Sequence, residues 1–265
     1  MSHSCGFQAR RFRTAAAGYA RFRLGYPDTL IRRVIALTEL NAGDPVLDLG
    51  AGPGLLALPF AEAGMAVTAV DPEPEMLDVL ENAAKSAQLT VRALAGSSFA
   101  MPSGIGPFRL VTIGRAFHWM DRVATLAELD RLVVPGGALA LFEDVNLKTV
   151  ENRWRGVLDA VAARFGADSA PHRQERADPN QRAHESVLQS SPFNRLETAG
   201  VVVQRELSVD DIVGLAGSQS VTSPQALGDR AAAFEAELRH ALAALSPDGR
   251  FVQIAEMRAL VARRS

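Results

Sequence analysis

The chain has 265 residues, of which 48% are hydrophobic and 22% charged, and its formal net charge is −2; this suits one α/β domain with a substantial core. The near-neutral charge and the lack of a recurring basic stripe argue against nucleic acid as a partner, and no apolar run approaches the roughly 18 residues of a membrane span. The lone Cys5 predicts no disulfide, no Cys/His cluster has metal-ligand spacing, and residues 1–4 do not resemble a signal peptide, so we expect a cytoplasmic protein without a metal.

Residues 8–40 carry aromatic and arginine side chains and then a helical pattern. Leu30, Val34 and Leu37 share one face of the predicted helix, and Ile31 and Ile35 share another. We expect one or two helices there, so that residues 1–40 form a cap ahead of the first strand.

A predicted buried strand over 46–49 leads into three glycines, Gly50, Gly52 and Gly54, and then into a helix over 54–63. Glycine allows a positive φ and a close approach of the backbone to a ligand, and the start of a helix offers unpaired N–H groups. The segment therefore predicts a site for a nucleotide-like ligand. A tight turn without a ligand is the alternative that the glycines alone leave open.

The spacing of the three glycines indicates which kind of nucleotide the loop binds. The dinucleotide motif G-x-G-x-x-G needs a glycine at position 55, where this chain has Leu55. Asp71 ends a second apolar run over 66–70, and an acid at that strand tip would accept hydrogen bonds from both ribose hydroxyls. The pattern disfavours a nicotinamide dehydrogenase.

The rest of the core alternates strands and helices, which predicts a parallel sheet with right-handed crossovers. Pro135-Gly136-Gly137 predicts a turn into the fifth strand, and the polar stretch 166–191 predicts either a substrate lid or an ordinary surface loop. The remaining predicted strands cover 90–94, 109–113, 138–142, 196–206 and 250–262, and the helices cover 74–86, 121–132, 150–165, 210–216 and 224–245.

Several segments of the chain resemble the conserved motifs of one protein family. Asp48 to Gly54, the Asp71 strand end and Pro135 to Leu139 look like the class I S-adenosylmethionine-dependent methyltransferases. Residues 19–27 and the segment 116–121, which contains Phe-His-Trp, are similar to the small-molecule "type 11" branch with trans-aconitate methyltransferase-like enzymes.

The resemblance spans nearly the whole chain and implies a fold. That fold is a Rossmann-like, doubly wound, mostly parallel seven-stranded sheet with helices on both faces. We expect a single domain over 1–265, with a cap over 1–40, a cofactor-binding core over 41–145, and a lid insertion and the last strands over 146–265.

In such a sheet ligands lie beyond the carboxyl ends of the strands. The resemblance implies that S-adenosylmethionine lies over the first three strands, with S-adenosylhomocysteine as the product. The glycines would pass close to its methionine and ribose portions, Asp48 would orient its ammonium group and Asp71 would hold its ribose. The residues expected around the adenine are Pro72, Met76, Ser97, Ser98 and Phe99, and those of the cap are Tyr19 and Arg23.

The acceptor would lie over the fourth and fifth strands, near 114–121 and Glu143-Asp144. His118 is the candidate general base, because a neutral imidazole accepts a proton near pH 7; a purely structural hydrogen bond is the alternative. Arg115 would bind the cofactor carboxylate or an anionic substrate, or else reach solvent. Trp119, Tyr26 and Trp154 are the expected substrate contacts.

The expected function is therefore methyl transfer from S-adenosylmethionine to a small-molecule acceptor, with an oxygen, nitrogen or carbon nucleophile. A protein of the same fold that keeps the cofactor but does not transfer its methyl group is the alternative. The sequence predicts neither the acceptor nor the oligomeric state.

Overall fold

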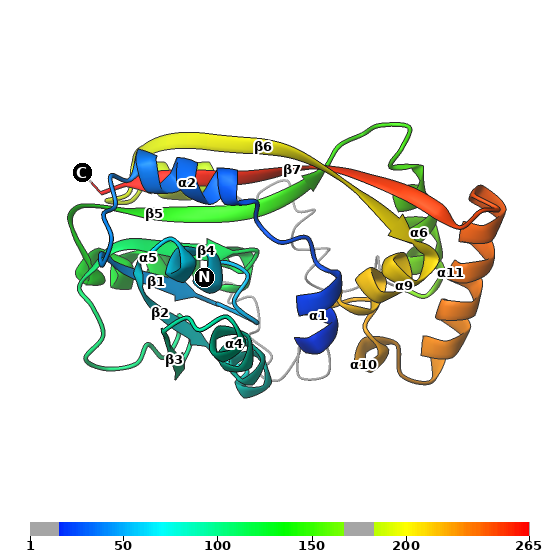
Figure 1. Cartoon of the computed structure of the whole chain (residues 1–265), viewed down its shortest axis with the longest axis horizontal. Helices are drawn as coiled ribbons and strands as arrows, with labels where there is room; N and C mark the ends of the chain where they lie inside the picture. The colour runs from blue at the N-terminus through cyan, green and yellow to red at the C-terminus, as the bar shows by residue number, and fades with distance from the viewer. Residues whose placement is uncertain (1–15, 167–182, 265) are drawn as a thin grey trace.

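The computed structural model describes residues 16–166 and 183–264, and its centre is a seven-stranded sheet of order β3-β2-β1-β4-β5-β7-β6 (Figure 1). The strands are β1 (Pro45–Leu49), β2 (Ala66–Asp71), β3 (Val91–Ala95), β4 (Phe108–Gly114), β5 (Val133–Asn146), β6 (Arg195–Ser208) and β7 (Arg250–Arg263). Strands β1 to β5 run parallel to one another, and β7 runs antiparallel to both β5 and β6. The predicted Rossmann-like, mostly parallel sheet is confirmed.

Helices cover both faces of this sheet. The α-helices are α1 (Ala16–Phe22), α2 (Asp28–Leu37), α3 (Ala57–Glu62), α4 (Pro74–Ser86), α5 (Arg122–Leu132), α6 (Arg153–Arg164), α8 (His184–Gln189), α9 (Val209–Gly217), α10 (Pro224–Leu227) and α11 (Ala231–Leu245). Two 3-10 helices are η1 (Phe117–Trp119) and η3 (Gly228–Arg230).

The two core faces follow from the alternation of side chains along each strand. In β1, Val46 packs in a cluster with α2, α3 and α4, whereas Leu47 and Leu49 pack in a second cluster with α5 and α8. Both faces of the central strands are thus packed against helices. This explains why these strands read as nearly continuous apolar runs.

Two elements differ from the sequence prediction. The turn expected at Pro135-Gly136-Gly137 is an irregularity inside the long strand β5, where the pairing with β4 shifts register between Phe108 and Leu110. The single helix predicted over 224–245 is divided, because Gly228 takes a φ of +56° and ends α10.

Strands β6 and β7 form a long two-stranded ribbon. They pair from Arg195↔Arg263 to Ser208↔Arg250, whereas β5 pairs with β7 only as far as Ala255. At about 3.3 Å per residue, 14-residue strands extend about 46 Å, well past the edge of the sheet.

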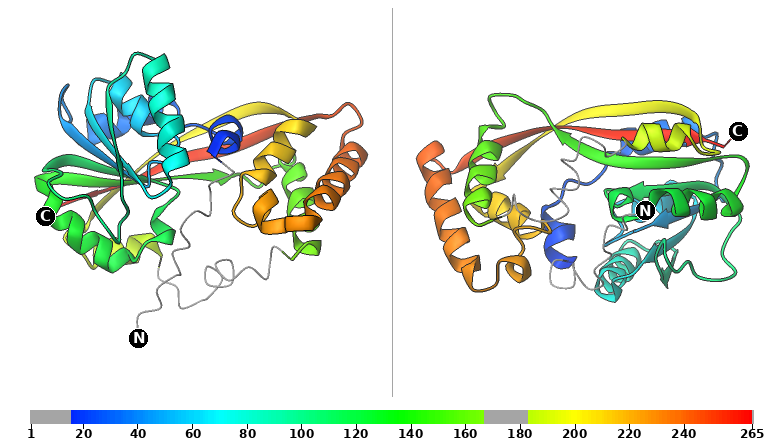
Figure 2. Two further views of the ribbon diagram at one scale, coloured as in Figure 1. Left: turned by 90° about the horizontal axis from the view of Figure 1, so that it is seen from below. Right: turned by 180° about the vertical axis from the view of Figure 1, so that it is seen from behind.

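The projecting end of the ribbon carries a group of helices, which we call the helical lobe: α6, α9, α10 and α11 (Figures 1 and 2). Its own core contains Trp154, Phe234 and Phe251. Helix α1 lies between the sheet and this lobe (Figure 1) and packs against α9.

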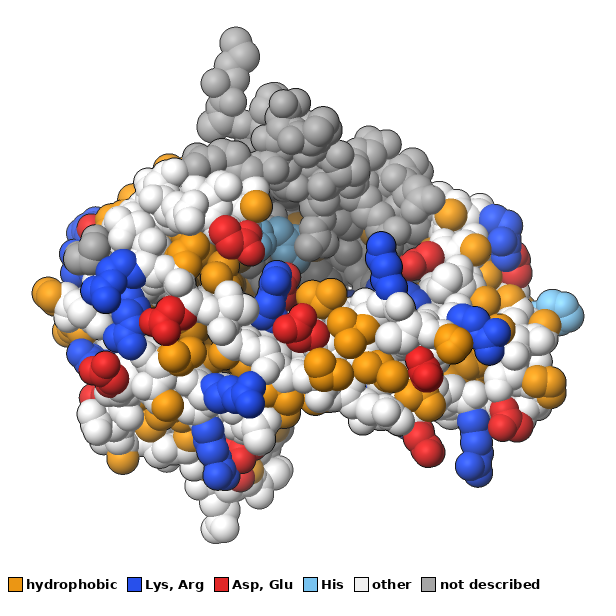
Figure 3. All heavy atoms as spheres, turned by 90° about the horizontal axis from the view of Figure 1, so that it is seen from above, with side chains coloured by type: hydrophobic (Ala, Val, Ile, Leu, Met, Phe, Trp, Pro, Cys, Tyr) orange, Lys and Arg blue, Asp and Glu red, His pale blue; other side chains and the backbone are white. Residues whose placement is uncertain are grey.

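The predicted lid over 166–191 lies mostly outside the described residues, since residues 167–182 are not described. Its end forms α8, which packs on the sheet through Val187 and Leu188. Residues 1–15 of the predicted cap, with Cys5, also lie outside. Over the described ranges no helix is long and apolar enough to cross a bilayer. On the face seen in Figure 3, acidic and basic side chains are interspersed.

Candidate functional site

The first two glycines of the loop after β1 have left-handed backbones, with φ of +73° at Gly50 and +54° at Gly52. The N–H of Gly50 donates to the carbonyl of Val70 at 2.8 Å, which ties the loop to the end of β2. A Cβ at Gly50 would lie 2.8 Å from the Cβ of Ala116, so this turn requires glycine for its conformation and for its packing. Gly52 faces open space in the hollow beside the loop.

The third glycine has a different role from the one expected. Gly54 has a φ of +91° and does not line the hollow; a Cβ there would lie 3.0 Å from Cγ of Leu80 on α4. Its lack of a side chain therefore allows the loop to pack against α4, which corrects the expectation that Gly54 approaches the ligand.

Asp71, at the end of β2, holds the loop in place. Its Oδ2 accepts a hydrogen bond from the N–H of Gly52 at 2.8 Å, and its Oδ1 accepts one from the N–H of Glu73 at 2.9 Å. Burial raises the pKa of the Asp71 carboxyl to about 6, against the opposing effect of these two hydrogen bonds. Each oxygen keeps a further lone pair for a ligand hydroxyl.

Asp48 faces the same hollow but is already engaged by the protein. Its Oδ2 accepts from the N–H of Ala57 at the start of α3, and its Oδ1 accepts from the hydroxyl of Thr112, both at 3.0 Å. Burial raises the pKa of the Asp48 carboxyl to about 7 despite both bonds. Asp48 therefore fixes the start of α3 through its hydrogen bond to Ala57. The expected contact between Asp48 and the ammonium group of S-adenosylmethionine stays a prediction.

The hollow beside the glycine loop, which we call the loop pocket, has a volume of about 150 Å³. All five residues expected around the adenine line it. Its walls are Tyr19, Tyr26, Asp48 to Pro53, Leu55, Leu56, Asp71 to Glu73, Met76, Ser97 to Phe99, Gly114 to Ala116, Trp119 and Met120.

A second hollow of about 410 Å³ lies between the helical lobe on one side and, on the other, the carboxyl ends of β4 and β5 and the middle of β7; we call it the inter-lobe pocket. It is lined from the sheet side by residues such as Ile113 and Asp144, and from the lobe side by Arg155 and Val221. The two pockets share four lining residues, Tyr19, Arg115, Ala116 and Trp119, so they meet at one wall.

Arg115 is the most constrained member of the shared wall. It follows β4 with a φ of +55°, which is unusual for a residue with a side chain. Its Nε pairs with Asp144, its Nη2 donates to the carbonyl of Leu24 at 2.7 Å, and its guanidinium carbon lies 4.8 Å from the ring centre of Tyr26. Its buried Nη1 makes no hydrogen bond to any described residue.

Three neighbouring side chains stabilise the protonated form of Arg115. Burial alone would lower the pKa of its guanidinium, but Tyr26, Asp144 and Tyr19 raise that pKa above the ordinary value. Arg115 therefore remains a cation beside both pockets, and it does not reach solvent as the alternative from sequence supposed.

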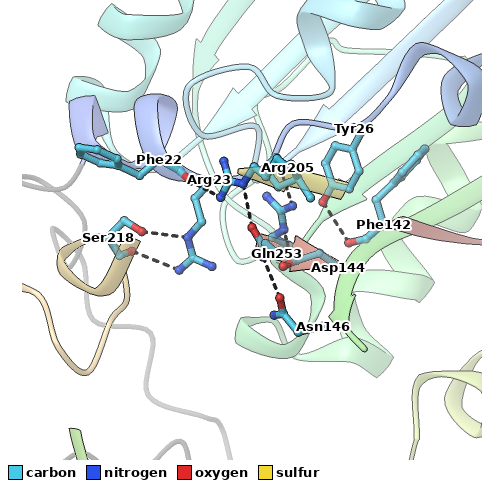
Figure 4. Close-up of polar contacts among 11 residues, drawn as sticks. Phe22, Arg23, Tyr26, Phe142, Asp144, Asn146, Arg205, Ser218 and Gln253 are labelled. Atoms are coloured by element: carbon cyan, nitrogen blue, oxygen red, sulfur yellow. Dashed lines mark hydrogen bonds and ion pairs between the residues drawn. The ribbon is translucent and has the colours of Figure 1, made fainter. Parts of the chain in front are cut away.

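Only one of the two expected cap residues reaches the loop pocket. Tyr19 lines both, whereas Arg23 lines only the inter-lobe pocket. The Nε of Arg23 donates to the hydroxyl of Ser218 at 3.0 Å and its Nη2 to the carbonyl of Ser218 at 3.3 Å (Figure 4). Arg23 thus joins the end of α1 to the helical lobe, away from the expected cofactor site.

The segment 116–121 places Trp119 in the shared wall and His118 beside it in the inter-lobe pocket. It forms η1, and Asp121 then caps α5 by accepting from the N–H of Ala124 at 3.1 Å. His118 lines the inter-lobe pocket and Trp119 lines both pockets, with 4.8 Å between their ring centres. Trp119, the predicted substrate wall, therefore lies where the two hollows meet, and His118, the predicted base, lies next to it in the inter-lobe pocket.

Two expected substrate contacts lie elsewhere. Tyr26 lines the loop pocket, and its hydroxyl donates to the carbonyl of Phe142 at 3.4 Å (Figure 4). Trp154 is fully buried in the core of the helical lobe, where its Nε1 donates to the carbonyl of Val252 at 2.9 Å. The expectation that Trp154 contacts a substrate is wrong, because its apolar ring is taken up by the lobe core.

Other lining residues of the inter-lobe pocket were not expected from the sequence. They come from α8, from the segment after α9 and from β7: His184, Glu185, Gln219, Ser220 and Arg258. No local motif marks them, since only the tertiary fold brings these elements to the strand ends. Among the described residues no group of three or more His, Cys, Asp or Glu side chains could hold a metal ion.

Comparison with known proteins shows which proteins this chain is similar to. Residues 46–137 match a methyltransferase domain model. An uncharacterized methyltransferase of Mycobacterium tuberculosis is 32% identical over 215 residues, which are 80% of this chain and 79% of that protein.

Two solved structures share the fold. One, assigned as a type II methyltransferase from Anaeromyxobacter dehalogenans, has a TM-score of 0.56 and 23% identity, covering 91% of this chain and 98% of the other. The YcgJ protein from Bacillus subtilis has a TM-score of 0.53 and 18% identity, covering 90% of this chain and 100% of the other. With the glycine loop, the acid at the end of β2 and the sheet order, these matches identify the chain as a member of the class I S-adenosylmethionine-dependent methyltransferase family.

Proposed function

We propose that this enzyme binds S-adenosylmethionine in the loop pocket and transfers its methyl group to a small-molecule acceptor in the inter-lobe pocket. The observation that carries the proposal is the shared wall of Tyr19, Arg115, Ala116 and Trp119. Methyl transfer is a displacement that gains most from proximity and alignment, and two pockets that meet at one wall would hold donor and acceptor side by side.

The residues of the loop pocket fit this cofactor chemically. Gly52 leaves open space where a side chain would project, and Asp71 offers carboxylate lone pairs that would accept hydrogen bonds from a ribose diol. Met76 and Phe99 offer apolar surface for a purine. The buried Nη1 of Arg115 would donate to the carboxylate of the methionine portion.

When bound, S-adenosylmethionine supplies a methyl group on a positively charged sulfur. His118 would accept the proton that a hydroxyl or a protonated amine loses on methylation, and Trp119 would form one side of the acceptor site. Tyr19 on α1 lines both pockets and would exclude water from their junction. The position of the Phe-His-Trp segment at the junction supports the small-molecule branch of the family.

Equilibrium binding tests this proposal most simply. Calorimetric titration of S-adenosylhomocysteine into the purified protein should give a 1:1 complex, and NAD should give none under the same conditions. An absence of binding by both S-adenosylmethionine and S-adenosylhomocysteine would refute the proposed function. Release of S-adenosylhomocysteine in the presence of an accepted small molecule separates a transferase from a protein that only retains the cofactor.

A further inference from the structure

The guanidinium of Arg115 is a rigid planar group that the protein holds at two of its three nitrogens. Its Nε pairs with the carboxylate of Asp144, and its Nη2 donates to the carbonyl of Leu24 at 2.7 Å. The ring of Tyr26 lies against the same group, with its centre 4.8 Å from the guanidinium carbon. Because the group is planar and rigid, these contacts also fix the position of the third nitrogen, Nη1.

Nη1 lacks the kind of partner that the other two nitrogens have. It is buried and makes no hydrogen bond to any described residue, and a buried N–H group without an acceptor is costly. The backbone of Arg115 is left-handed, with a φ of +55°, and such a conformation persists where the surroundings hold it, often at functional sites. Since Arg115 lines the loop pocket, an anionic group there would supply the missing acceptor.

Strand β5 places Asp144 beside this guanidinium. Alternate residues of a strand share a face, so Asp144 lies on the same face as Phe142, whose carbonyl accepts from the backbone N–H of Arg115 at 2.9 Å. Glu143 lies on the opposite face and pairs with Arg258 instead. The order of residues in β5 therefore brings the carboxylate of Asp144, and not that of Glu143, to Arg115.

Asp144 keeps its negative charge in this position. Burial alone would raise the pKa of its carboxyl, but the charges of Arg115 and Arg23 lower that pKa below the ordinary value. The side chains of Arg115 and Asp144 are only 10% and 19% exposed, so their attraction is screened less than that of a surface pair. The ion pair is therefore present at neutral pH. Without it, the guanidinium of Arg115 would keep only the hydrogen bond to Leu24.

We propose that Asp144 is a positioning residue for the cofactor. Together with the carbonyl of Leu24, it fixes the guanidinium of Arg115 so that Nη1 donates to the carboxylate of the methionine portion. This rests on the proposed function, in which Arg115 binds that carboxylate in the loop pocket. Of the two pockets Asp144 lines only the inter-lobe pocket, so it acts on the cofactor through Arg115.

Calorimetry with two ligands tests this role. S-adenosylhomocysteine carries the carboxylate, whereas its decarboxylated analogue, with an aminopropyl group on the sulfur, lacks only that carboxylate. We expect the wild type to bind S-adenosylhomocysteine about ten-fold more tightly than the analogue, because a charge-assisted hydrogen bond is made only by the former. Asp144→Ala should lose most of this ratio, through weaker binding of S-adenosylhomocysteine and unchanged binding of the analogue.

Two other roles of Asp144 predict different results. If Asp144 acted only as a negative charge near the cofactor, Asp144→Ala would strengthen the binding of the carboxylate ligand. If it only stabilised the fold, both ligands would lose affinity equally. Either result overturns the proposal, and so does a wild type that binds the two ligands equally.

Matched variants connect the effect to Arg115. Arg115→Met should remove the preference for the carboxylate, and Asp144→Ala added to it should change the ratio no further, because the residue through which Asp144 acts is gone. A further change in the double variant contradicts the assignment. Asp144→Asn keeps the shape and a neutral acceptor oxygen, so it should show a smaller loss of the same kind and replaces the alanine variant if that one is unstable.

Asp130→Ala is the control. It breaks the ion pair of Asp130 with Arg264, and neither of these residues lines either pocket. The ratio of the two affinities should therefore equal that of the wild type. An equal loss of the ratio in Asp130→Ala and Asp144→Ala would overturn the specific role of Asp144.

The melting temperature of each variant is measured first. If S-adenosylhomocysteine does not bind to the wild-type protein, the proposed function fails and the role of Asp144 fails with it. If S-adenosylhomocysteine binds but Asp144→Ala keeps the wild-type ratio, only the role of Asp144 fails. The two failures are therefore distinguishable.

Discussion

At the scale of single residues, Asp71 holds the glycine loop in place beside the loop pocket. Its two oxygens already fix the N–H groups of Gly52 and Glu73, so the loop and the start of α4 are set before any ligand arrives. Pre-organisation of this kind lowers the cost of binding. The acid is thus both a support for the loop and the proposed ribose contact.

Asp71→Ala should weaken the affinity for S-adenosylhomocysteine by about 100-fold, because charge-assisted hydrogen bonds to the ribose and the support of the loop are lost. Calorimetric titration measures this. Asp78→Ala is the control, since Asp78 is exposed on α4 and does not line the pocket. If both variants bind as the wild type does, the ribose assignment is wrong.

His118→Gln should lower kcat by about 100-fold or more for an acceptor that must lose a proton, with the affinity for S-adenosylhomocysteine unchanged. The rate of S-adenosylhomocysteine release measures kcat, and His240→Gln on the exposed side of α11 serves as the control. A kcat equal to that of the wild type assigns His118 to a structural role.

The raised pKa of Asp48 should make the stability of the protein depend on pH. Its folded pKa of about 7 lies above the ordinary value of 3.8, so its contribution to stability is full below about pH 4 and is lost as the pH rises to 7. Between pH 5.5 and pH 8 this amounts to about 2 kcal/mol.

The nearly isosteric change Asp48→Asn removes this titration. The variant should therefore gain stability relative to the wild type on going from pH 5.5 to pH 8, as measured by urea unfolding at both values. A constant difference in the free energy of unfolding between the two proteins would mean that Asp48 titrates normally in the fold.

At the scale of elements, α1 is held in place by a close contact with α9. A Cβ at Gly214 would lie 2.4 Å from the ring of Phe22, so this glycine allows the two helices to pack together. The carbonyl of Phe22 also accepts from Arg205, whose Nε donates to Gln253 (Figure 4). The position of Tyr19 over the junction depends on these contacts.

Gly214→Ala should therefore displace α1, at a cost of about 1–3 kcal/mol in stability, and weaken the binding of S-adenosylhomocysteine several-fold. Gly217→Ala is the matched control in the same helix, because a Cβ there meets nothing within 4 Å. Thermal unfolding and calorimetry on both variants measure the effect. An equal response of the two variants would exclude a role for the contact between α1 and α9.

The elements also show why some features were predictable from the sequence. The apolar runs of β1, β2 and β4 and the tight turn at Gly50 are local signals, and these strands appear where the sequence placed them. By contrast, Trp154 carries no local sign that its ring is enclosed by α9 and α11 of the lobe. The break at Gly228 was likewise hidden in a sequence with helical propensity on both sides.

At the scale of the whole molecule, the sheet and the helical lobe are joined by the β6–β7 ribbon, by the β5–α6 connection and by α1 (Figure 2). The loop pocket is formed mostly by the core, and the residues that follow each strand of the core could be named from the sequence. The inter-lobe pocket depends on how the lobe meets those strand ends. His118 and Trp119 could be proposed because they belong to a local motif that follows β4, whereas no local motif marks His184, Gln219 and Arg258.

The central claim is that donor and acceptor meet at the wall shared by the two pockets. A crystal structure of the complex with S-adenosylhomocysteine tests it most directly. We predict that the ribose hydroxyls lie within hydrogen-bond distance of the Asp71 carboxylate and that the sulfur faces the inter-lobe pocket between Tyr19 and Trp119. A ligand bound away from Asp71, or with its sulfur turned from that wall, would contradict the account.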